Sequence, residues 1–201
     1  RERRREPAGQ GVGPSHHDGT RLRLSEERAL PYGQVVQEVD LVLLEVNARY
    51  WGSLALAGFP FVRNNIRKDF IRIVDQTGWR QLKADARVLC IHQSVDGATV
   101  GPAGYTFRYA HDVIRTGDIP GDFAAVLAGH IHRFQVITED LRGRPLKTAV
   151  FYPGSIERTS FAENNERKGY LTLEFSGDPS AGRLSKWKFA ELPARPMIQL
   201  E

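Results

Sequence analysis

The sequence has only one cysteine, Cys90, among its 201 residues. One cysteine cannot form an intramolecular disulfide, so the chain is not a disulfide-stapled secreted scaffold, and nothing indicates an oxidising compartment. Long apolar runs are also absent, since no segment approaches the roughly 18–20 apolar residues that span a bilayer. The sequence therefore predicts a cytoplasmic protein that does not associate with a membrane.

A strong excess of charge of one sign is absent as well. The 28 Lys and Arg against 24 Asp and Glu give a net charge of +4, which permits a phosphate-bearing partner but does not require one. With 41% hydrophobic and 26% charged residues, the composition is that of a globular domain, and it excludes a disordered or fibrous chain. The length predicts one domain with its own core.

Residues 1–34 begin with a cluster of arginines and contain many glycines and prolines, with little apolar periodicity. We expect them to form a basic, poorly packed leader, and residues 35–201 to form the folded portion. The arginines are not followed by the apolar core of a signal peptide. Because the first residue is Arg rather than Met, we also expect the chain to be either a processed product or a piece of a longer protein.

Apolar patterns in the folded portion predict an α/β protein. Residues 65–76 carry apolar side chains three or four positions apart, which is typical of an amphipathic helix. Residues 93–121 are rich in Gly, Pro and Asp and predict a long loop. Mixed strands and helix favour a layered architecture. Short β-rich runs predict strands at 39–46, 54–57, 87–91, 123–128, 134–137, 148–152 and 170–175.

Histidines follow two of the predicted strands. His92 follows one of them, and Gly129-His130-Ile131-His132 follows the next. In an extended segment the rings of His130 and His132 project to the same side, and Gly129 lets the backbone bend sharply. Imidazole is the commonest side-chain metal ligand, and open α/β sheets place ligands at the carboxyl ends of strands. The three histidines indicate a metal site, with polar loop histidines as the alternative.

A third string, residues 152–163 (YPGSIERTSFAE), completes a recognisable order. Over residues 40 to 175, the order of His92-Gln93, the G-H-I-H string and this string resembles the C-terminal half of a calcineurin-like metallophosphoesterase. The third string is most similar to the branch of DNA double-strand-break repair exonucleases. The resemblance implies part of a four-layer α/β/β/α sandwich, with mixed sheets and flanking helices.

The resemblance also implies roles for individual residues. His92 and His130 match ligands of the family's second metal ion, and His132 matches a ligand of the first. The implied activity is hydrolysis of a phosphoester, as a phosphodiesterase or DNA exonuclease, with two divalent ions, Mn²⁺ being the expected metal. A phosphoester substrate such as DNA and a partner ATPase subunit are the implied partners. Phosphomonoesterase or protein phosphatase activity stays open, because metal ligands do not select the substrate.

Motifs from the N-terminal half of the family are missing or degraded. No D-x-H string and no Gly-Asp pair occurs before His92. The family's G-N-H-D/E motif aligns with Ser15-His16-His17-Asp18. This match gives His16 a metal-ligand role and His17 a catalytic role, with a solvated polar turn as the alternative.

The missing carboxylates weaken the expected activity. Two ions roughly 3.5–4 Å apart need anionic ligands, and three neutral histidines supply none. Asp96 and Asp112 are acidic residues of the long loop that could add charge. We therefore expect the chain alone to bind one divalent ion weakly and to be weakly active or inactive. The alternative is a noncatalytic remnant on the same scaffold that binds nucleic acid or a protein.

The sequence also gives expectations for Arg158, for a turn near it and for a run of aromatic residues. Arg158 is expected to contact a substrate phosphate. A mixed charged surface is the alternative for Arg158 and for the charged residues around it, Glu157, Glu163, Glu166, Arg167 and Lys168. Pro153-Gly154-Ser155 fits a simple turn. Two alternatives, a buried strand and a platform on which bases stack, fit the alternating aromatic residues Tyr105, Phe107 and Tyr109.

Overall fold

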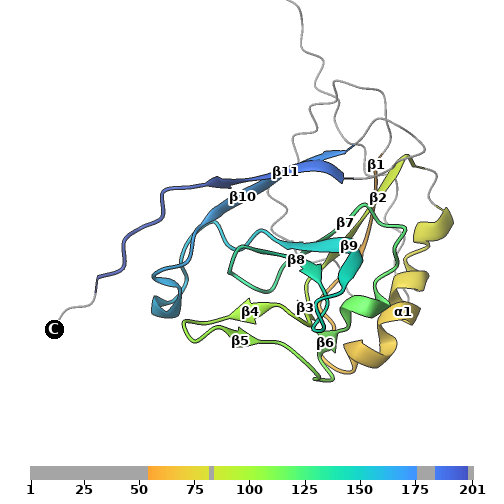
Figure 1. Cartoon of the computed structure of the whole chain (residues 1–201), viewed down its shortest axis with the longest axis horizontal. Coiled ribbons are helices and arrows are strands. Elements are labelled where there is room, and N and C mark those ends of the chain that lie inside the picture. Colours follow the sequence, from red (N-terminus) through yellow and green to blue (C-terminus); the bar gives the residue numbers. More distant parts are fainter. Residues whose placement is uncertain (1–53, 82–83, 176–183, 199–201) are drawn as a thin grey trace, which may run out of the picture. The chain divides into compact units, whose positions relative to one another are not determined.

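The computed structural model describes residues 54–81, 84–175 and 184–198. Every described residue belongs to one compact unit, residues 47–201. The expected leader, with His16 and His17, and the expected strand at 39–46 lie outside the described residues. The described part is mixed α/β, with many strands and few helices (Figure 1). None of its helices has the length and apolar character needed to cross a membrane.

A five-stranded mixed sheet lies between two apolar clusters. Four of its strands run parallel, and β8 joins the edge antiparallel to β9. The carboxyl ends of the parallel strands β2 and β7 therefore lie next to each other, along the edge of the sheet at which the parallel strands end. The strand order is β1 (Leu54–Phe59), β2 (Ala86–Ile91), β7 (Ala125–Ala128), β9 (Pro145–Tyr152), β8 (Gln135–Glu139) (Figure 1).

Helix α1 (Ile66–Gln76) covers one face of the sheet. Its buried side chains, Ile66, Phe70 and Val74, have the helical spacing that predicted it, so the expected helix at 65–76 is confirmed. Phe70 packs edge-on against Phe59 of β1, with ring centroids 6.1 Å apart. A single-turn helix, η1 (Trp79–Gln81), follows and buries Trp79 in the same cluster.

A hairpin of β10 (Gly169–Phe175) and β11 (Leu184–Glu191) packs against the other apolar cluster. This cluster contains Val88, Ala125 and Phe151, which alternate along their strands with residues of the helix-side cluster. Phe151 meets Trp187 of β11 at a ring distance of 5.8 Å. Because both faces are covered, the central strands are apolar on both sides. β11 was not expected from the sequence.

The segment 93–121 is not one uninterrupted loop, which corrects the expectation. Its apolar residues Val95, Val113 and Ile114 are buried and anchor short strand pairs. Asp96 is buried too, and its Oδ1 accepts a hydrogen bond from the Thr116 N–H at 2.8 Å. The elements are β3 (Ser94–Val95) paired with β6 (Val113–Ile114), β4 (Thr99–Val100) paired with β5 (Tyr105–Thr106), and η2 (Thr116–Asp118).

Candidate metal centre

Strands β2 and β7 bring His92 and His130 to the same edge of the sheet. Ile91 and Ala128, the last residues of the two strands, are paired in register. The Gly129 N–H then donates to the Ile91 carbonyl at 2.9 Å. As a result, the imidazole centroids of His92 and His130 lie 5.4 Å apart, with the ring planes at 68°.

This separation fits a shared metal ion. Metal–nitrogen bonds of about 2.0–2.1 Å put an ion roughly 3.2 Å from each ring centroid, so ligands at 90–180° have centroids roughly 4.5–6.4 Å apart. The observed 5.4 Å lies inside this range. Within the described ranges, no group of three His, Cys, Asp or Glu side chains is arranged to hold an ion. The two histidines are therefore a pair of neighbouring imidazoles without a third such donor arranged beside them among the described residues.

Gly129 makes the close approach of the two strand ends possible. A Cβ atom at this position would lie 2.8 Å from Nδ1 of His92. Real Cβ atoms essentially never come that close to another heavy atom, so the His92 ring fills the space that a side chain would need. The glycine is therefore required by the position of the His92 ring, in addition to any freedom that it gives the backbone.

The backbone of His130 is left-handed, with φ of 79°. The expected extended segment is therefore wrong at this position, because the chain bends at His130, and strand alternation does not set the directions of the His130 and His132 rings. A non-glycine residue in this region costs on the order of 1–3 kcal/mol and persists only where its surroundings hold it. Such residues concentrate at functional sites, which supports a functional role for His130.

The aromatic side chain of Phe61 packs against the imidazole rings of His92 and His130. It stacks on His130 at a centroid distance of 5.2 Å and meets His92 edge-on at 6.1 Å. The buried Gln93 holds the loop of Phe61, because its Nε2 donates to the Val62 carbonyl at 3.0 Å. Phe61 was not expected at the site, since a lone aromatic residue after a strand carries no sequence signal for this contact.

Electrostatics favour neutral rings at this edge. Burial lowers the pKa of both His92 and His130, and repulsion from neighbouring charged rings, including that of His132, lowers both further. Asp112 acts on the pKa of His130 in the opposite direction. Metal ions bind the neutral imidazole, and the lowered pKa values keep both rings in this form to more acidic pH than ordinary histidines.

His132 is held by another part of the chain. Its Nδ1 lies 3.0 Å from Oε1 of Glu163 and 3.2 Å from Oγ1 of Thr159. Its carbonyl oxygen accepts hydrogen bonds from the Ser155 N–H at 3.2 Å and from Nζ of Lys168 at 3.1 Å. The third expected ligand is thus tied to the 152–163 string through both its side chain and its backbone.

Glu163 and Lys168 do not belong to a mixed charged surface, which corrects that expectation. The Lys168 side chain is completely buried, and its Nζ atom lies 2.6 Å from Oε2 of Glu163. Burial raises the pKa of Glu163, but hydrogen bonds from Lys168, His132 and Thr159 outweigh burial and lower it to about 2. Sequence reasoning missed this pair because a lysine before a strand looks like an exposed one.

Arg158 binds the chain's own backbone in this structure. Its guanidinium donates to the carbonyl oxygens of Glu163 at 3.2 Å, Glu166 at 3.3 Å and Arg195 at 2.8 Å. These bonds hold the 152–163 string in place and occupy donors that a phosphate would need. The expected contact between Arg158 and a substrate phosphate stays a prediction.

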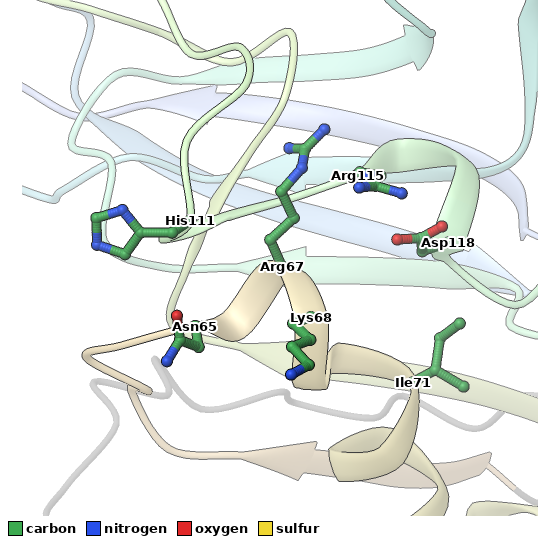
Figure 2. A pocket seen from close by; sticks show the side chains of 7 residues that line it. All are labelled: Asn65, Arg67, Lys68, Ile71, His111, Arg115 and Asp118. Atoms are coloured by element: carbon green, nitrogen blue, oxygen red, sulfur yellow. The ribbon is translucent and has the colours of Figure 1, made fainter.

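Among the described residues, one cavity lies at the candidate site and another lies away from it. One of about 240 Å³ is lined by His130, His132, Glu163 and Glu166, among others, so it opens beside the histidines. The other, of about 460 Å³, is a basic pocket at the start of α1 that none of the three histidines lines. Figure 2 shows its residues: Asn65, Arg67, Lys68, Ile71, His111, Arg115 and Asp118.

A comparison of the chain with protein-family models gives no match, and a comparison with curated proteins gives none either. The assignment of the candidate site therefore rests on the geometry of its residues.

Proposed function

We propose that this chain carries part of the metal centre of a phosphoester hydrolase of the calcineurin-like type. The observation that carries the proposal is the pair of rings of His92 and His130, 5.4 Å apart at the ends of adjacent parallel strands. The contact between the 152–163 string and His132 supports it, because it joins the two most specific motifs in space. The helix, mixed sheet and hairpin are compatible with part of a four-layer sandwich.

In this proposal His92 and His130 hold one divalent ion, with Mn²⁺ the expected metal, and His132 offers Nε2 to another. An ion held by these residues would supply Lewis acidity and would lower the pKa of a water molecule. The chain's own residues shape the site: the Phe61 ring packs against the rings of both His92 and His130. The cavity beside His130 and His132 leaves room for a phosphate group.

The chain by itself is expected to be a poor catalyst. Histidines are neutral ligands, and two dications held close together need negative charge. Asp96 is occupied by the Thr116 N–H, so among the loop carboxylates Asp112, which acts on the pKa of His130, is the better candidate. We therefore propose weak Mn²⁺ binding and little or no turnover for the isolated chain.

A phosphodiester such as DNA is the substrate that we propose, and a partner ATPase subunit is proposed from the family resemblance. The basic pocket offers the side chains of Arg67, Lys68 and Arg115 (Figure 2). Cationic side chains of this kind position a nucleic acid through its phosphates without reading its sequence.

A noncatalytic nucleic-acid-binding module is the second candidate, and the same basic pocket favours it. The two candidates differ in their dependence on the histidines. In the noncatalytic case, binding of a short DNA measured by fluorescence anisotropy would weaken in Lys68→Ala and Arg115→Ala. It would be unchanged in His92→Ala and His130→Ala, with or without Mn²⁺.

The test of the metal centre is a calorimetric titration of Mn²⁺ into the chain. His92→Ala and His130→Ala should each weaken binding by about 10-fold or more, because each removes a direct ligand. The matched control is His111→Ala, which removes an imidazole from the basic pocket and should leave the affinity unchanged. Equal affinities for wild type and the three variants would contradict the proposal.

A further inference from the structure

Glu163 contacts five groups through its two carboxylate oxygens, one of them the Ser160 hydroxyl, which lies 3.4 Å from Oε1. Oε1 accepts a hydrogen bond from the Thr159 hydroxyl at 2.8 Å and lies 3.0 Å from Nδ1 of His132. Oε2 lies 2.6 Å from Nζ of Lys168 and 3.4 Å from the Thr159 N–H. The Glu163 side chain is 13% exposed, so these contacts leave it little freedom to rotate.

Lys168 fixes the charge and the orientation of Glu163. Its side chain is 0% exposed, and its ammonium has three acceptors: Oε2 of Glu163, Oγ of Ser155 at 2.8 Å and the carbonyl of His132 at 3.1 Å. An ammonium has three N–H donors, so all of them are used. A buried ammonium is stable only beside a counter-charge, which keeps Glu163 ionised.

An ionised carboxylate can only accept hydrogen bonds. Oε1 of Glu163 lies 3.0 Å from Nδ1 of His132, so a free electron pair on that nitrogen would be repelled by the carboxylate, and the Thr159 hydroxyl has the same carboxylate oxygen as an acceptor at 2.8 Å. The ring nitrogen must therefore carry the proton itself and donate it. A neutral imidazole with a proton on Nδ1 has its free electron pair on Nε2.

We propose that Glu163, held by the buried Lys168, is a positioning residue that fixes His132 in the tautomer with Nε2 free to bind a metal ion. A carboxylate that accepts from the distal N–H of a ligating histidine orients the ring and raises its basicity. The metal is the part of this inference that rests on the proposed function. The tautomer itself depends only on contacts among Glu163, Thr159, Lys168 and His132.

The test begins with the wild-type chain without metal, at about pH 8, where an ordinary histidine is neutral. Long-range ¹H–¹⁵N spectra distinguish the two neutral tautomers, and a His132→Ala spectrum assigns the signals. The inference predicts that His132 carries its proton on Nδ1. A His132 proton on Nε2, or an even mixture of the tautomers, would overturn it without any need for a variant at Glu163.

Glu163→Gln sharpens the test at almost constant volume. Lys168 would hold the amide oxygen, so the amide NH₂ would face His132 and would require an acceptor there. We expect the His132 tautomer to reverse and the Mn²⁺ affinity, measured by calorimetry, to fall by about 10–100-fold. Glu166→Gln is the matched control, because Glu166 lines the same cavity but pairs with Arg133 at 2.6 Å.

The outcomes separate the two proposals. If His132 reverses its tautomer in Glu163→Gln but no variant or wild type binds Mn²⁺, the positioning role stands and the proposed function fails. If the tautomer in Glu163→Gln is unchanged, with circular dichroism showing a folded chain, the positioning role is wrong whatever the metal affinity is.

Discussion

At the scale of single residues, Gly129 is tightly constrained at the candidate site. Its missing side chain leaves the space that the His92 ring occupies. Gly129→Ala should push the ring away from His130, because the new Cβ would lie 2.8 Å from Nδ1 of His92. We predict a fall in Mn²⁺ affinity of about 10-fold, measured by calorimetry, since one of two close ligands is displaced.

Gly117→Ala serves as the control for this substitution. A Cβ added at Gly117 would have no heavy atom within 4 Å, and the residue has no positive φ, so it isolates the effect of adding a methyl group. It should leave Mn²⁺ affinity unchanged. Wild-type affinity in Gly129→Ala would mean that the position of the His92 ring does not matter for binding.

Residue patterns could predict the histidines but not their supports. His92 and His130 follow apolar strands, and a residue that follows a strand can be located from the sequence. Phe61, Glu163 and Lys168 reach the site only because separate loops fold back onto it. Their contacts depend on distances across the fold, and those distances have no counterpart in sequence spacing.

At the scale of elements, the turn in the 152–163 string is more than a connection between strands. Gly154 has φ of 80°, and a Cβ there would lie 2.8 Å from the His132 carbonyl oxygen and 2.9 Å from the Phe134 nitrogen. Gly154→Ala should lower the free energy of unfolding by roughly 2–4 kcal/mol, because it combines a left-handed backbone with a clash against fixed backbone atoms. Urea denaturation measures the change.

Gly104→Ala separates the two contributions. Gly104 is also left-handed, with φ of 65°, but nothing lies within 4 Å of its Cβ position. Gly104→Ala should therefore lower the free energy of unfolding only by the cost of a left-handed backbone, about 1–2 kcal/mol. Equal losses in the two variants would mean that the close approach of Gly154 to His132 adds nothing to stability.

The turn between β8 and β9 gives a prediction for pH dependence. Asp140 accepts hydrogen bonds from the side chain of Arg144 and from the backbone of Arg142 and Arg144, which lower its pKa from 3.8 to about 2. A carboxylate with a lowered pKa stabilises the fold above its ordinary pKa, and this contribution is lost as the pH falls toward the lowered value. Asp140→Ala should therefore lower Tm at neutral pH.

The difference in Tm between wild type and Asp140→Ala should shrink as the pH is lowered from about 5 to about 3. Thermal unfolding followed by circular dichroism measures it, with the exposed Asp122→Ala as the control. A difference that stays constant down to about pH 3 would show that the side chain acts through something other than its charge.

Element patterns predicted much of the described fold. The helix at 65–76 was found because only one face of α1 is buried, and six of the seven expected strands correspond to β1, β2, β7, β8, β9 and β10. The strand pairs inside 93–121 were missed because each of their strands is only two residues long. β11 was missed, although Lys186-Trp187-Lys188-Phe189 alternates polar and aromatic residues as a strand does.

At the scale of the described part of the molecule, the site is a consequence of parallel pairing. α1 and the β10–β11 hairpin cover opposite faces of the sheet, so the side chains of the candidate site lie at the edge where β2 and β7 end. The 152–163 string and Lys168, just before the hairpin, reach back to His132 at that edge. The same few loops thus contribute both to the packing of the fold and to the candidate site.

The most direct test of the central claim is a crystal structure of the chain soaked in Mn²⁺, with the ion located by its anomalous signal. The account predicts a peak between His92 and His130, within about 2.0–2.3 Å of a ring nitrogen of each. A well-ordered His92 and His130 with no peak between them, or with the only peak elsewhere on the molecule, would contradict it.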